Sequence, residues 1–265
     1  MNILLISGHG AGDPGAQGCG YKEADLTREL TKLIAADLKG YQKVNVYRYP
    51  ESRNAYKDVS ASQLNNVLKQ NFPGVKFDYV FEVHFNAFNG KAYGTEIFVT
   101  FAEKEISVEQ EVMKNMKKYF TLRDDQSPKD GVKRSNFLVI HTFKNKGVSS
   151  ALLETCFIDN KEDMKTYNAN KKKISADIAA GIAAGFGLKK AAAAATVKKE
   201  VKAGSKVKVA PDAVIGGLAA NRGTAASSYL KSKTWHVVKI QKNKGVQEAL
   251  LDCSTWIAVK YLTAL

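Results

Sequence analysis

The chain has 265 residues, of which 45% are apolar and 25% are charged, and it carries a formal net charge of +14 at pH 7. This composition is typical of a globular protein and excludes disorder over the whole length. No run of about 18 apolar residues occurs, so a transmembrane helix and insertion into a membrane are not expected. The cysteines, Cys19, Cys156 and Cys253, are widely spaced, which predicts free thiols rather than a disulfide framework.

The N-terminal segment predicts a buried strand at residues 2–7. It is a short apolar stretch with no basic segment ahead of it. This pattern differs from that of a secretory signal peptide, which has a positively charged start and a longer apolar region. We therefore expect the protein to begin in a cytoplasm, with no signal peptide.

Strand-like and helix-like patterns then alternate over residues 1–188. Apolar residues three or four apart predict helices at 23–39, around 64–68, at 108–120 and at 174–186. Between them, short apolar runs predict strands at 44–47, 79–84, 96–100, 138–140 and 151–154. This alternation predicts an α/β domain with a mostly parallel sheet flanked by helices. Ligands of such sheets bind beyond the carboxyl ends of the strands.

The pattern changes after residue 188. Residues 189–200 are a low-complexity run of lysine and alanine, which predicts a linker. Residues 201–265 alternate with a period of two, which predicts a small all-β domain. The net charge is +4 over residues 1–188 and +10 over residues 189–265. The basic segment is therefore expected to meet a polyanion such as nucleic acid, an anionic membrane or an anionic cell-wall polymer.

Three side chains suited to metal or acid–base chemistry stand at predicted strand ends. His9 follows the first strand in a loop rich in glycine, while His84 and Glu154 each end a later strand. Parallel strands bring these ends to one edge of the sheet, where Glu23 can join them from the start of the first helix. Two imidazoles and one carboxylate suit a catalytic zinc ion, and a further carboxylate is needed to carry a proton.

Each of these residues taken alone also has a structural explanation, because a lone histidine is more often a core or surface residue. His141 and His236, which lie in lysine-rich surroundings, are assigned structural roles. The case for chemistry therefore rests on the combination.

The combined segments resemble the zinc-dependent N-acetylmuramoyl-L-alanine amidases of the α/β family often called amidase type 3. The resemblance covers about residues 2–187 and rests on HGAGDPGA at 9–16, Glu23, HFNA at 84–87, GTEI at 94–97 and LETCFIDN at 153–160. It implies that His9, Glu23 and His84 bind Zn²⁺ and that Glu154 is the catalytic carboxylate. Asn86 would lie at the substrate groove or beside the ligands. The chain departs from the family pattern at Glu82 and Val83, where a serine is common, which bears on a substrate contact.

The family's reaction is hydrolysis of the amide that joins the lactyl group of N-acetylmuramic acid to the L-alanine of the stem peptide. The basic tail is similar to the SH3-like wall-binding modules of lysins, on residues 203–209 and 250–257. These resemblances imply peptidoglycan and anionic wall polymers of a Gram-positive host as partners. Together with the missing export signal, they favour a phage endolysin that waits in the host cytoplasm and then acts on the bacterial cell wall.

Other functions remain open at this point. A zinc peptidase acting on stem peptides, or a host autolysin with the same amidase chemistry, would fit the same residues. A nucleic-acid binder would fit the basic tail, but no aromatic-rich RNA-binding pattern is present, so nucleic acid is not expected as a partner. Trp235, Trp256 and Tyr229 could stack on sugars, although core packing is the expected role for two of the three.

Overall fold

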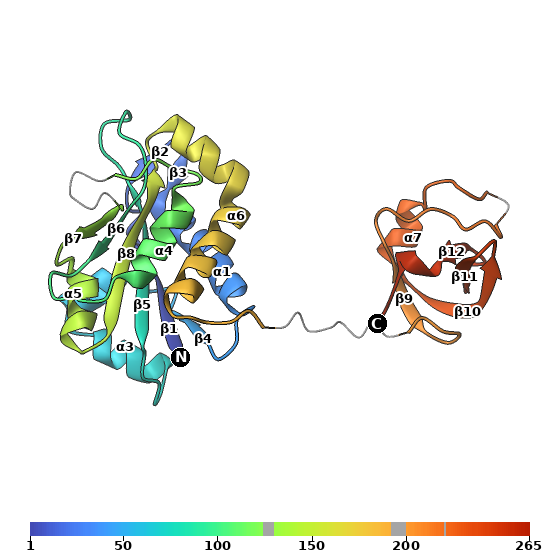
Figure 1. Ribbon diagram of the computed structural model, residues 1–265, viewed down its shortest axis with the longest axis horizontal. Helices are drawn as coiled ribbons and strands as arrows, with labels where there is room; N and C mark the ends of the chain where they lie inside the picture. Colours follow the sequence, from blue (N-terminus) through green and yellow to red (C-terminus); the bar gives the residue numbers. More distant parts are fainter. Residues whose placement is uncertain (124–129, 192–199, 220) are drawn as a thin grey trace. The chain divides into compact units, whose positions relative to one another are not determined.

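The computed structural model describes residues 1–123, 130–191, 200–219 and 221–265. The chain divides into two compact units, Met1–Ala191 and Ala192–Leu265 (Figure 1). Most of the predicted linker, residues 192–199, lies outside the described residues. Residues 189–191 of the predicted linker are described and belong to the first unit, where the Ala191 amide donates to the Gly40 carbonyl.

The first unit is built on a six-stranded sheet with the order β4-β1-β5-β8-β6-β7 (Figure 1). All neighbouring strands are parallel except β6 and β8, which run antiparallel. The strands are β1 Asn2–Ser7, β4 Asn45–Arg48, β5 Tyr79–Asn86, β6 Glu96–Val99, β7 Val132–Arg134 and β8 Ser149–Phe157. A separate short ribbon pairs β2 Gln17–Gly18 with β3 Tyr21–Lys22. The prediction of an α/β fold with a mostly parallel sheet is confirmed.

Helices cover both faces of this sheet. One face packs on α1 Glu23–Leu38, α4 Ser107–Met116 and α6 Lys161–Gly185. The other packs on α2 Ala55–Ser60, α3 Leu64–Asn71 and α5 Leu138–Asn145. The four central residues of strand β1 are all apolar because helices cover both faces of the sheet. Ile3 and Leu5 face the first set of helices while Leu4 and Ile6 face the second, and all four are fully buried.

The prediction of a strand at 138–140 is wrong, because these residues begin helix α5. Three consecutive apolar residues fit a buried strand and a buried helix equally well. The deciding residue is Phe143, which lies three and four positions beyond Ile140 and Val139 and is buried with them. That spacing places the three side chains on one helical face against the sheet.

The second unit contains a five-stranded antiparallel sheet with the order β12-β11-β10-β9-β13, which confirms the all-β prediction apart from one short helix, α7 Ser228–Ser232. Its strands are β9 Lys206–Val209, β10 Thr234–Asn243, β11 Val246–Leu251, β12 Trp256–Ala258 and β13 Leu262–Ala264, with a 3₁₀ turn at Val259–Tyr261. Trp235 and Val237 point into the core while His236 between them is exposed. Among the described residues of both units, no helix is both long enough and apolar enough to cross a bilayer.

Helices α4 and α6 pack closely because α6 presents glycine at the contact. A Cβ atom added at Gly181 would lie 2.6 Å from the Cα of Val112, well inside van der Waals contact. We expect Gly181→Ala to lower the free energy of unfolding by about 1–3 kcal/mol through overpacking. Helix propensity alone would predict the opposite sign, a gain of about 1 kcal/mol. Urea denaturation of the two proteins distinguishes the effects, and a stabilised variant would contradict the close packing.

Candidate metal centre

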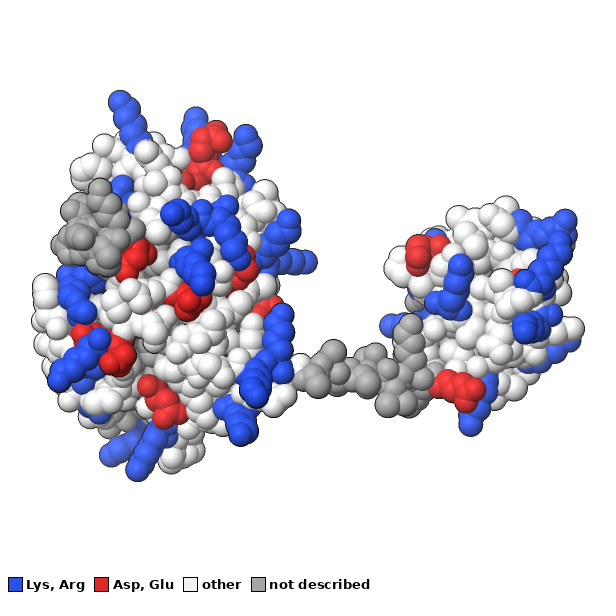
Figure 2. Space-filling view, viewed as in Figure 1, with Lys and Arg blue, Asp and Glu red and all other residues white. Residues whose placement is uncertain are grey.

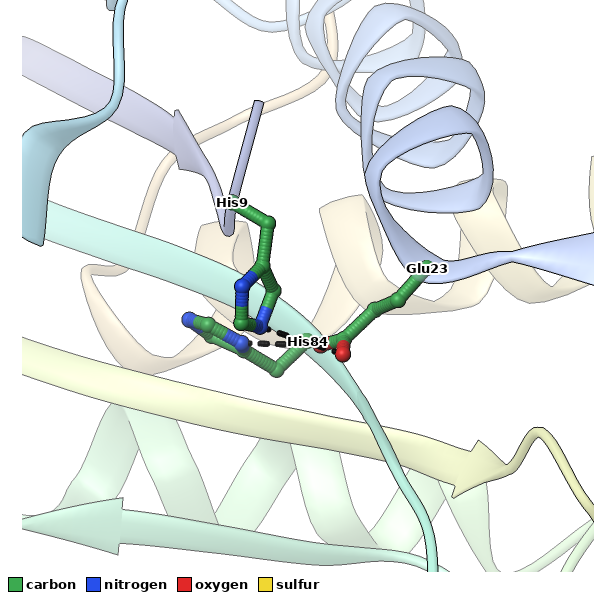
Figure 3. A group of neighbouring side chains, drawn as sticks. All are labelled: His9, Glu23 and His84. Carbon is green, nitrogen blue, oxygen red and sulfur yellow. Dashed lines mark hydrogen bonds and ion pairs between the residues drawn. The ribbon is translucent and has the colours of Figure 1, made fainter. Parts of the chain in front are cut away.

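The predicted site residues meet at the carboxyl edge of the sheet (Figure 3). His9 lies just beyond β1, His84 lies near the end of β5, and Glu23 is the first residue of α1. One ligand atom from each of the three lies within 4.8 Å of the others. Among the described residues this is the group of histidine, cysteine and acidic side chains that could hold a metal ion.

Glycines allow the chain to pass this closely around the cluster. A Cβ atom at Gly8 would lie 2.3 Å from Cε1 of His84. A Cβ atom at Gly15 would lie 2.6 Å from Cδ2 of His9 and 2.7 Å from Oε2 of Glu23, and Gly15 also has a φ of 65°. Glycine is therefore required at both positions, which explains the composition of the loop.

Glu23 joins the two histidines. Its Oε2 lies 3.1 Å from Nε2 of His9, and its Oε1 lies 2.9 Å from Nδ1 of His84. The carboxylate is 3% exposed, and it also accepts hydrogen bonds from the backbone amides of Ala16 and Phe85. Both oxygens of a buried carboxylate are thus satisfied and fixed in direction.

The cluster favours positive charge. Hydrogen bonding to Glu23 raises the pKa of His9 above its ordinary value. Burial lowers the pKa of His84, but the hydrogen bonds to Glu23 and Glu82 outweigh it and raise that pKa well above the ordinary range. Burial also opposes ionisation of Glu23, yet the two histidines hold its pKa below the usual range. An electrostatic field that retains protons on two imidazoles also suits a divalent cation between the same three groups.

Two further carboxylates contact the outer nitrogens of the histidines. Asp13 Oδ2 lies 3.0 Å from Nδ1 of His9 and accepts a 3.0 Å hydrogen bond from the Asn54 amide. Glu82 Oε1 lies 3.2 Å from Nε2 of His84. Such contacts fix the ring orientation and the tautomer of a metal-binding histidine. Neither role was predicted from the sequence, although the two-residue period of a strand places Glu82 on the same face as His84.

Glu154 lies directly beside the cluster, since it pairs with His84 in the register of β8 and β5. Its Oε2 is buried and has no hydrogen-bond partner among the described residues. Burial raises the pKa of this carboxyl to about 7, against the opposing effect of His84. A carboxyl group with this pKa can accept and release a proton near neutral pH.

The other candidate residues fall outside the cluster. Asn86 donates a 2.7 Å hydrogen bond to Oε1 of the buried Glu96, which faces Glu154 across β6 and β8. His141 lies in α5 near the Asn145 amide, and His236 lies in the second unit near Asp252. Neither histidine contributes to the metal cluster.

Comparison with known families identifies the fold and chemistry of the first unit. The model of the N-acetylmuramoyl-L-alanine amidase family matches residues 3–184. The chain belongs to this family. It is therefore a hydrolase of the peptidoglycan amidase class, and its α/β sheet carries the candidate metal centre at the edge where this architecture places its ligands.

Individual relatives agree with this assignment. The chain is 29% identical over 212 residues to the endolysin of Bacillus phage SPP1, covering 77% of this chain and 72% of the endolysin. It is 26% identical to the sporulation-specific N-acetylmuramoyl-L-alanine amidase of Bacillus subtilis, covering 81% and 79%. Among solved structures, the catalytic domain of the CD27L endolysin, which targets Clostridia difficile, has the same fold, with a TM-score of 0.53 at 22% identity over 69% of this chain and 96% of that one.

The close approach of Gly8 to His84 gives a direct test of the site. We expect Gly8→Ala to displace the His84 ring and to lower amidase activity about 100-fold, because small misplacements of reacting groups have effects of this size. The matched control is Gly40→Ala, where the added Cβ would meet only the Asp37 carbonyl at 3.1 Å. Turnover of purified cell walls measures both, and equal activity of the two variants would show that His84 does not need its observed position.

Proposed function

We propose that the protein is a zinc-dependent endolysin that cleaves the amide between N-acetylmuramic acid and the L-alanine of the stem peptide. The observation that carries this proposal is the gathering of His9, Glu23 and His84 beside Glu154, whose Oε2 is buried. The donor set of two imidazole nitrogens and one carboxylate oxygen is one that catalytic zinc sites use. The residues present therefore fit the metal, with His9, Glu23 and His84 as its ligands.

A zinc ion bound there would polarise the scissile carbonyl and lower the pKa of a water molecule. Glu154 accepts the proton of the attacking water and returns it to the nitrogen of the leaving L-alanine, a task that matches its pKa of about 7. Asp13 and Glu82 hold the imidazole rings of His9 and His84 in place.

Glu154→Gln tests the proton transfer. The variant keeps the size of the side chain but loses the titrating group, so we expect the rate to fall about 10²- to 10⁴-fold. Zinc content, measured by elemental analysis of the purified protein, should be unchanged because Glu154 is not among the proposed ligands. Unchanged turnover would remove Glu154 from the mechanism.

Mass spectrometry of the wall fragments from the same experiment identifies the bond that is cut. An amidase produces peptides with a new N-terminal L-alanine, whereas a zinc peptidase acting within stem peptides leaves L-alanine attached to muramic acid. A host autolysin with the same amidase chemistry is a second candidate for the biological role. It is favoured by the 26% identity to the Bacillus subtilis sporulation amidase over 81% of this chain.

For the whole chain we propose a catalytic domain at 1–188, a linker at 189–200 and an SH3-like wall-binding domain at 201–265. The antiparallel sheet of the second unit supports this division. Basic side chains stand on the face of this unit drawn in Figure 2, and Lys206 and Lys208 project outward from β9. Such a surface suits the anionic polymers of a Gram-positive wall.

Of Trp235, Tyr229 and Trp256, the first is buried and the other two are exposed or partly exposed. Trp235 is 9% exposed, packs in the core and donates its ring N–H to the Leu230 carbonyl. Tyr229 is 56% exposed, with the Lys233 ammonium 4.4 Å from its ring centre. Trp256 is partly exposed beside Lys239. We therefore propose Tyr229 and Trp256, and not Trp235, as surfaces for sugar rings.

Removing the positive charge of β9 tests the wall-binding proposal. We expect Lys206→Gln combined with Lys208→Gln to weaken retention on purified walls and to make retention less sensitive to salt, because fewer charges are screened. The matched control neutralises Lys161 and Lys165, which are exposed on α6 of the first unit. Sedimentation of each variant with walls at rising salt gives the comparison. Equal losses in both double variants would contradict a specific role for the second unit.

A further inference from the structure

A cavity of about 280 Å³ opens beside the metal centre on the sheet face covered by α2 and α5. His84 and Glu154 are among the residues that line it. The rest of its wall is largely apolar and includes Ala55, Leu138, Val139 and Leu152. Two aromatic rings on this wall, Tyr56 and Phe137, are 59% and 40% exposed. The cavity is therefore an apolar pocket next to the reacting groups, with aromatic rings open to solvent.

Among the described residues, Glu82 is one of two acids on this wall with an unpaired buried oxygen, the other being Glu154, to which the proposed mechanism assigns proton transfer. Glu82 is 3% exposed, and its Oε1 contacts His84. Its second oxygen, Oε2, is also buried and has no hydrogen-bond partner among the described residues. A buried carboxylate oxygen without a donor is unfavourable, so it marks a place where a ligand could supply one. The proposed mechanism uses the contact of Glu82 with His84 and leaves Oε2 unused.

The charges around the cavity restrict what can enter it. Asp13, Glu82 and Glu154 all line it, and no lysine or arginine does so among the described residues. His9 and His84, the proposed metal ligands, line it as well, so a free carboxylate of the stem peptide would find no lysine or arginine partner on the described wall of this cavity. The cavity instead suits a neutral group that offers one N–H donor and a small apolar end.

Muramic acid carries such a group next to the bond that the family cleaves. The lactyl ether that holds the scissile carbonyl is on one ring carbon, and the acetamido group is on the neighbouring carbon. An acetamido group has one N–H donor and a methyl end. A sugar ring in this position also offers an apolar face to the exposed rings of Tyr56 and Phe137.

We propose that this cavity binds the 2-acetamido group of the muramic acid at the cleavage site, with its N–H donating to Oε2 of Glu82. The inference rests on the proposed amidase function and adds the recognition of the glycan side of the bond. Its methyl group packs on the apolar wall of the cavity.

The test uses two synthetic muramoyl-L-alanine peptides that differ in one atom. One carries the 2-acetamido group, and the other carries a 2-acetoxy group, which keeps the methyl and carbonyl but has no N–H. We expect wild-type protein to cleave the acetamido compound with a kcat/KM at least about tenfold higher, because the ester leaves Glu82 Oε2 without a donor. This kcat/KM ratio is measured on the wild-type protein, so it does not depend on whether any variant folds.

Glu82→Gln then assigns the preference to this side chain. When Nδ1 of His84 faces the proposed metal, its Nε2 carries the proton, so the amide oxygen of Gln must face His84 and its NH₂ group must face the cavity. That donor opposes the N–H of the acetamido group and suits the ester oxygen. We expect the kcat/KM ratio of the two compounds to fall to about one or to invert. Any effect through His84 lowers both rates equally and leaves the ratio unchanged.

Glu109→Gln is the matched control, because Glu109 is also a buried acid, 2% exposed, but it is bonded to Tyr79 and does not line the cavity. It should keep the wild-type ratio. Equal cleavage of the two compounds by the wild type, or an unchanged ratio in Glu82→Gln, would overturn the inference while leaving the amidase proposal intact. Failure of the wild type to cleave either compound would count against the proposed function and this inference together.

Discussion

The site depends on one buried carboxylate that faces two imidazoles. Glu23 is held by α1 and by two backbone amides, and each of its oxygens points to a different histidine. His9 follows β1 and His84 lies in the neighbouring strand β5, so their rings meet edge to face with centroids 5.1 Å apart, and Glu23 contacts both. Because burying a carboxylate is costly unless it is paired, the same contact that stabilises Glu23 also orders the two rings.

Around this contact the structure repeats a simple arrangement, in which each imidazole has one carboxylate on either side. His9 lies between Glu23 and Asp13, and His84 lies between Glu23 and Glu82. The outer carboxylates determine which ring nitrogen carries the proton, and they leave the inner nitrogens directed at Glu23. The family assignment supplies the reaction class, while this arrangement explains how the chain holds the ligand geometry.

The sequence alone predicted the site residues whose positions follow from the direction of the strands. His9 follows β1, while His84 and Glu154 lie toward the carboxyl ends of β5 and β8, so their convergence could be predicted from the parallel direction of the strands. Residues that depend on side-chain direction in a loop, such as Asp13, or on the shape of a cavity, such as Glu82, could not. The error at α5 has a related cause, since a three-residue apolar run does not specify its period. In the second unit, alternation predicted the strands but not which aromatic residues are exposed.

The different roles proposed for Glu82 and Glu154, two acids on neighbouring strands, follow from their different contacts. Both line the same cavity, and each has one buried oxygen without a hydrogen-bond partner among the described residues. Glu82 is anchored through its other oxygen to His84, so its remaining oxygen is a fixed acceptor that is suited to recognition. Burial raises the pKa of Glu154 to about 7, so that this carboxyl can exchange a proton near neutral pH. The hydrogen bond between Glu82 and His84 is therefore the contact that distinguishes the proposed recognition role of Glu82 from the proposed proton transfer by Glu154.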